Sequence, residues 1–105
     1  MMLGFRTAYE ICTGRSWKWP RVRDAWLKDH PTCVVTGQFA DTVHHIEPVH
    51  VNPSRELDPT NFASMTDAAH FAVGHLGNWK LSNAEFRTCV KWLNSGRRGP
   101  VGEVE

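Results

Sequence analysis

Two segments of the chain carry apolar residues at helical spacing. In the first, Val22, Trp26 and Leu27 would share one side of a helix that covers about residues 20–30. Pro20 suits the first turn of such a helix, because the missing N–H of proline is not needed there. We therefore expect a helix in this segment, with its polar residues facing outward.

The second helical segment lies toward the C-terminal end. Ser82 and Glu85 have the Ser-x-x-Glu spacing of a capping box, in which both side chains bond backbone N–H groups at a helix start. The apolar residues that follow at helical spacing are Phe86, Cys89, Val90 and Leu93. The pattern predicts a helix that begins at this box.

The residues between these helices favour strands and turns. Three β-prone runs predict short strands: residues 33–35, 43–46 and 61–65. A polar loop, 47–60, separates the last two, and it is longer than most connections in a compact domain. Thr66 or Asp67 can cap a short helix that runs through Val73 and stops at Gly74. The expected fold class is therefore α+β.

Composition limits the class of protein. The 105 residues, 41% of them hydrophobic, suffice for one domain with one modest core. A formal net charge of +1 excludes a nucleic-acid binder of the strongly basic, tail-like type, but not a basic face on the folded domain. No apolar run approaches the roughly 20 residues of a transmembrane helix, and the three cysteines form no Cys-x-x-Cys pair. We therefore expect a cytoplasmic protein without a membrane partner.

Three parts are expected along the chain. They are a partly ordered N-terminal arm (1–18), a folded domain (19–94) and a flexible tail (95–105). Basic residues outnumber acidic ones toward both ends, whereas acidic residues dominate the middle. Such a distribution suits a cation site between arms that bind a polyanion, although an ordinary solvated surface has a similar composition.

Histidines gather in the same middle segment. Five of the six lie within residues 44–75, namely His44, His45, His50, His70 and His75. A single histidine is more often a surface or core residue than a ligand. Five in one short window indicate a metal site, because imidazole is the commonest side-chain ligand of transition metals.

The segment His44-His45-Ile46-Glu47-Pro48, followed by Asn61 and His70, resembles an HNH endonuclease, a ββα-metal nuclease. Asn61 comes sixteen residues after His45, and His70 comes nine after Asn61. The phrase Gly74-His75-Leu76-Gly77-Asn78-Trp79 is similar to a G-H-L-G-x-W motif of one bacterial subgroup. The resemblance covers about residues 15–82. It implies a ββα-metal core with flanking N- and C-terminal helices, so that 19–94 would be the nuclease domain.

The resemblance also implies roles for individual residues. His44 and His70 would hold one divalent cation (Mg²⁺, Mn²⁺, Ni²⁺ or Zn²⁺), and His45 would be the general base that deprotonates water. Asn61 is similar to the middle Asn of the family, which pins the long loop and orients the base. Strand geometry supports the division between His44 and His45, because adjacent residues on a strand point to opposite faces.

His75 is a third candidate ligand. On an ideal helix it lies 140° around from His70, so the two side chains would not share a face. A left-handed backbone conformation at Gly74 can end the helix and turn the His75 side chain toward that of His70. Colicin-type members of the superfamily also use two histidines near the helix for their ion. A substrate-facing or purely structural role for His75 stays open.

One feature of many relatives is largely missing. They hold a structural zinc with two cysteine pairs, and the corresponding positions here are Cys33, Thr36, Met65 and Ala69. A lone thiol cannot hold structural zinc, so we expect no such site. Cys33 is then predicted to be a small buried hydrophobe.

DNA, most simply double-stranded, is the expected partner. Arg55, Trp79 and Lys80 are candidate contacts, together with the basic, tryptophan-containing stretch 15–23. Trp26 and Trp92 are predicted to belong to the core, whereas Trp17, Trp19 and Trp79 stay open between core and surface.

The expected function is metal-dependent hydrolysis of DNA phosphodiester bonds. The main alternative is a degenerate HNH module that binds metal and DNA without cutting. A second alternative is a structural clip, in which histidines close a tetrahedral zinc site that has no open position. The sequence does not predict the oligomeric state.

Overall fold

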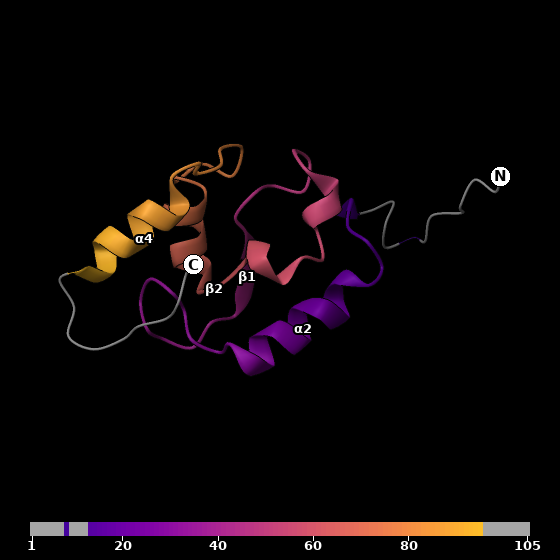
Figure 1. Cartoon of the computed structure of the whole chain (residues 1–105), viewed down its shortest axis with the longest axis horizontal. Coiled ribbons are helices and arrows are strands. Elements are labelled where there is room, and N and C mark those ends of the chain that lie inside the picture. The colour runs from indigo at the N-terminus through magenta and orange to yellow at the C-terminus, as the bar shows by residue number, and fades with distance from the viewer. Residues whose placement is uncertain (1–7, 9–12, 96–105) are drawn as a thin grey trace.

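The computed structural model describes residue 8 and residues 13–95 of the chain. Most of the expected N-terminal arm, and the expected tail from residue 96, lie outside these residues. Within them, two strands, β1 (Thr42–His45) and β2 (Phe62–Met65), pair antiparallel, with His44 opposite Ala63 and His45 opposite Phe62. Helices α2 and α4 lie on opposite sides of this hairpin (Figure 1). The expected α+β class is therefore confirmed.

Helix α2 (Trp19–Asp29) covers one face of the hairpin. Pro20 occupies its first turn, as predicted. Trp19 packs with Val43 and Phe62 in a small core, and the indole N–H of Trp26 donates to the hydroxyl of Ser64 over 3.0 Å. Trp19 is thereby a core residue, and the partly buried Trp26 packs against the same core.

The other face of the hairpin is covered by three consecutive helical pieces. Thr66 caps the short helix α3 (Asp67–Ala69), which continues without a break into the π-helical segment η3 (His70–Gly74). Helix α4 (Phe86–Ser95) follows. The second and larger core lies between these pieces, the hairpin and the turn before it, and consists of Cys33, Val34, Val35, Ala63, Met65, Ala69, Phe86 and Val90. The hairpin therefore separates two cores, and its two faces meet different surroundings.

The predicted strand at 33–35 is wrong. These residues form a turn, in which the N–H of Gly37 donates to the carbonyl of Cys33 and the N–H of Cys33 donates to the carbonyl of Gln38. Gly37 has φ 78°, a value that permits the tight reversal. Val34 and Val35 are buried from this turn, and the N–H of Val34 donates to the carbonyl of Ser64 in β2 over 3.0 Å. The stretch therefore packs against the sheet without forming a strand of its own.

Two predictions for the last helix are also wrong. The helix begins at Phe86 and not at the Ser82 box, because Asn83 is buried and its side-chain oxygen accepts from the N–H of Glu85. Trp92, predicted to be a core residue, is 75% exposed. It lies about 200° around the helix from the buried Val90, which places it on the solvent side.

Candidate functional site

The end of β1 directs two neighbouring histidines to opposite faces of the hairpin. His44 is 2% exposed and lies on the face covered by η3 and α4, where its ring packs 4.8 Å from that of Phe86. His45 lies on the face covered by α2, with its ring 4.4 Å from Trp19. One strand therefore supplies a histidine to each side of the sheet, as strand alternation requires.

His70 and His75 are brought together by the π-helical segment. The N–H of His75 donates to the carbonyl of His70 over 3.1 Å, so the two residues are joined by an i to i+5 backbone bond. This wider turn brings the two imidazoles together edge to face, with ring centroids 4.7 Å apart and Nε2 atoms 3.1 Å apart. An ideal α-helix would have separated these side chains.

The expected left-handed residue at Gly74 is absent. The left-handed residues are the next two after His75, Leu76 with φ 54° and Gly77 with φ 77°. Gly74 has another role: a Cβ atom at this position would lie 3.0 Å from Cε1 and Nδ1 of His44 and 3.1 Å from Cδ2 of His70. The missing side chain lets the His44 ring approach the helix closely.

Three imidazoles, those of His44, His70 and His75, form a cluster whose candidate ligand atoms all lie within 4.8 Å of one another. The buried Nε2 of His44 has no hydrogen-bond partner within the described part of the chain. Nδ1 of His75 lies 2.7 Å from the carbonyl of Leu81, to which it can donate, and this leaves a lone pair on its Nε2. An unpaired buried nitrogen and a fixed tautomer both fit a metal ligand set.

The charge state of the cluster also suits a metal. Burial, helped by the neighbouring histidines, lowers the pKa of His44 to about 3, and burial lowers the pKa of His70 to about 4. Both rings are therefore neutral at pH 7 and offer lone pairs. The remaining histidine of the segment, His50, is exposed on the loop and lies outside the cluster.

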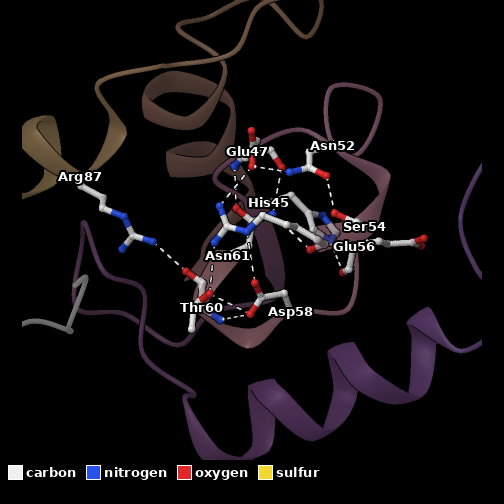
Figure 2. Close-up of polar contacts among 10 residues, drawn as sticks. His45, Glu47, Asn52, Ser54, Glu56, Asp58, Thr60, Asn61 and Arg87 are labelled. Atoms are coloured by element: carbon white, nitrogen blue, oxygen red, sulfur yellow. Dashed lines mark hydrogen bonds and ion pairs between the residues drawn. The ribbon is translucent and has the colours of Figure 1, made fainter.

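His45 is held in one orientation. Its Nε2 lies 2.8 Å from the backbone carbonyl of Glu56, so Nε2 carries the proton and Nδ1 keeps the lone pair (Figure 2). Burial lowers the pKa of His45 to about 4, the hydrogen bond to Glu56 opposes this, and the charge of Arg15 adds to it. The neutral ring can accept a proton at Nδ1.

Asn61 ties together the loop between β1 and β2. It is fully buried; its side-chain oxygen accepts from the N–H of Glu47 over 2.7 Å, and its amide donates to the carbonyls of Glu47 and Arg55 (Figure 2). Glu56, whose carbonyl holds His45, is the residue directly after Arg55. The contacts of Asn61 therefore fix the loop that orients His45.

Arg55, a candidate DNA contact, lies within this loop network. Its guanidinium is 3.1 Å from carboxylate oxygens of both Glu47 and Asp58, and it also donates to the hydroxyl of Thr60. These contacts brace the loop, and two carboxylates compete with any phosphate for the guanidinium.

The other two candidate DNA contacts lie beside the histidine cluster. Trp79 is 58% exposed, and its ring lies 5.2 Å from that of His70 and 4.9 Å from that of His75. Lys80 follows it and is exposed. Trp17, which the sequence left open, is also exposed.

Arg15 has a closer relation to the site than the sequence indicated. Its charge lowers the pKa of both His45 and His70, residues on two different elements. The next residue, Ser16, donates its backbone N–H to the Glu56 carboxylate over 2.7 Å, which joins this segment to the loop. The sequence indicated only that the basic stretch 15–23 could contact DNA, and nothing in the stretch distinguished Arg15 from its neighbours.

Cys33 lies in the larger of the two cores. The residue is completely buried, and its sulfur accepts from the N–H of Thr36. Among the described residues, the group of three or more metal-ligating side chains consists of His44, His70 and His75, and Cys33 does not belong to it.

Comparisons with known proteins found no relative of this chain. No family model matches the chain, and no curated protein or solved structure matches it. Within the described residues, no helix has both the length and the apolar character needed to cross a bilayer.

Proposed function

We propose that this chain is a metal-dependent endonuclease of the HNH type, which hydrolyses DNA phosphodiester bonds. In this proposal the hairpin, α3 and η3 form a ββα-metal core. The observation that carries the proposal is the contrast between two adjacent residues of β1. His44 joins a cluster of three imidazoles, whereas His45 is a separate, neutral and oriented imidazole. It points to the other face of the strand, yet it is near enough for its charge to lower the pKa of His44 and His70.

The cluster would hold one divalent cation through His44, His70 and His75. When bound there, the cation would polarise a phosphate and offset the charge that develops on the leaving oxygen. Three protein ligands are typical of catalytic sites with an open position, whereas structural zinc sites use four. The three-histidine set therefore favours catalysis over the closed structural clip.

The same donor set favours certain ions. Imidazole nitrogens suit Zn²⁺ and Ni²⁺, whereas Mg²⁺ and Mn²⁺ prefer oxygen ligands. We expect Zn²⁺ or Ni²⁺ to bind the cluster more tightly than Mg²⁺.

His45 would accept a proton from the attacking water. Its Nδ1 is the atom for this step, because Nε2–H is engaged with the carbonyl of Glu56. The hydrogen bond would also stabilise the imidazolium that forms, since the Glu56 carbonyl accepts from a more acidic N–H in that state. Asn61 acts through the loop as a positioning residue.

Contacts to the DNA backbone would come from both sides of the site. Arg15 lies near His45 and His70, and Lys80 follows Trp79 on the cluster side. Cationic side chains so placed would attract phosphates and fix the register of the duplex.

A plasmid-nicking assay with Mg²⁺, Mn²⁺, Ni²⁺ or Zn²⁺ tests the proposal. The wild type should convert supercoiled plasmid to open-circular DNA with at least one ion. His45→Ala should slow this by about 10²–10⁴-fold, the usual contribution of a general base. The matched control is His50→Ala, because His50 is exposed and outside the site, and it should cut as the wild type does. Absence of cleavage with all four ions would favour the DNA-binding module instead.

A further inference from the structure

The loop after η3, residues 75–81, exposes an unusual amount of apolar surface next to the histidine cluster. Leu76 is 52% exposed, Trp79 58% and Leu81 47%. His75, which contributes to the cluster, is the first residue of this loop. The apolar surface therefore begins one residue from a candidate metal ligand.

The loop is tightly braced. The N–H of Gly77 donates to the carbonyl of Phe71 over 2.9 Å, and the N–H of Asn78 donates to the carbonyl of His75 over 3.0 Å. The side-chain oxygen of Asn78 accepts from the N–H of Lys80, and the N–H of Leu81 donates to the Asn78 carbonyl. The loop consequently presents its exposed side chains on a fixed frame.

The backbone conformation and the exposure of Leu76 do not contribute to the stability of the fold. Its φ of 54° is left-handed, a conformation in which a leucine is strained and asparagine or glycine is favoured. The residue is nevertheless 52% exposed, so burial does not offset the strain. Strained residues held by a braced backbone are found at functional sites.

We propose that Leu76 is a wedge that enters duplex DNA and unstacks a base step beside the phosphate to be cut. This inference rests on the proposed function, since a phosphate bound at the cluster would bring the adjoining base pairs to the loop. Apolar side chains that enter the minor groove separate base steps in this way. The loop also carries Lys80 and has no acidic residue, which suits a polyanion and not an acidic protein surface.

Trp79 would support the unstacked base. Its ring packs on Phe71, His70 and His75 and still leaves an open aromatic surface. Stacking of bases on such a surface is tolerant of sequence. The substrate class that follows is duplex DNA. The protein would prefer flexible pyrimidine–purine steps, because these steps are unstacked at the lowest cost in free energy.

The test uses a short duplex with 2-aminopurine at several interior positions, since this base fluoresces more strongly when it is unstacked. Binding is measured with Zn²⁺ or Ni²⁺ present, on a duplex whose phosphorothioate linkages resist hydrolysis, so that the cluster can hold its cation while the strands stay intact. Saturating wild-type protein should raise the fluorescence. Leu76→Asn should abolish the rise and weaken binding by no more than about tenfold, because phosphate contacts dominate affinity. Leu76→Met, which keeps a long apolar side chain, should restore it.

The controls separate this inference from loss of folding and from the proposed function. Leu76→Asn should melt at or above the wild-type temperature, because asparagine tolerates the left-handed backbone. Phe39→Asn removes a different, 85% exposed apolar side chain and should leave the fluorescence rise intact. A rise without cleavage under any ion would refute the proposed nuclease activity and would leave Leu76 as a wedge beside a phosphate that is bound but not cut. Wild-type binding without a rise, no binding, or a full rise with Leu76→Asn would overturn the wedge.

Discussion

A methyl group added at Gly74 would test whether close approach of the His44 ring to the π-helical segment builds the candidate metal site. Its Cβ would lie 3.0 Å from two atoms of the His44 ring and 3.1 Å from Cδ2 of His70. Carbon atoms pack best at about 3.5–4.0 Å, so the rings must move by about 0.5–1 Å. Metal–ligand distances tolerate only about 0.2 Å, and comparable disturbances around ligands cost about 10–100-fold in affinity. Gly74→Ala should therefore weaken metal binding by that factor.

The fold should survive this substitution. Gly74 has no positive φ, and alanine in a helix is more stable than glycine by about 1 kcal/mol. Overpacking costs about 1–3 kcal/mol, so the free energy of unfolding should change by at most about 2 kcal/mol. Thermal melts in EDTA check this point before metal affinity is compared.

Isothermal titration calorimetry with Ni²⁺ and Zn²⁺ gives the affinities. Ala72→Ser is the matched control, because it adds one atom to the same π-helical segment at an exposed position. Its affinity should equal that of the wild type. A folded Gly74→Ala protein that binds either ion as tightly as the wild type would refute the reasoning.

Three further predictions concern the surroundings of the site. Asn61→Ala should lower the free energy of unfolding in urea by about 1–3 kcal/mol, because it leaves buried backbone groups unpaired; an unchanged midpoint would contradict this. Lys80→Ala should reduce the salt dependence of DNA affinity by about one unit of log–log slope, and Arg55→Ala should not, since Glu47 and Asp58 hold that guanidinium; equal slopes for both variants would argue against this assignment. Cys33→Ala should leave the metal content of the purified protein unchanged, and a stoichiometric loss of zinc would show a second site.

Local patterns predicted the elements that position the site. The period-2 geometry of a strand separates His44 from His45, and the positions of Pro20 and Thr66 mark the beginnings of α2 and α3. These signals depend on neighbours in the chain, so they can be read without the tertiary structure.

Other features depend on contacts between distant segments. The π-helical bond between His70 and His75 cannot be seen in the sequence, because an ideal helix sets the two residues 140° apart. The late start of α4 depends on Asn83, which donates its backbone N–H to the carbonyl of Gly74 and its amide to the carbonyl of Val73. Tertiary bonding to η3 thereby displaces the helix start from the Ser82 box.

The solvent exposure of Trp92 had a different cause. The helical positions of Phe86 and Val90 already place Trp92 on the opposite side of α4, so the amphipathic period outweighs the tendency of tryptophan to be buried.

In the proposed mechanism, His44 holds the metal and His45 accepts the proton of the attacking water. The most direct measurement is calorimetric metal binding beside plasmid nicking for the wild type, His44→Ala and His45→Ala. We predict that His44→Ala loses metal affinity, whereas His45→Ala keeps nearly all of it and loses cleavage by about 10²–10⁴-fold. If His45→Ala loses the metal as badly as His44→Ala, or if it cuts DNA at the wild-type rate, the assigned roles are wrong.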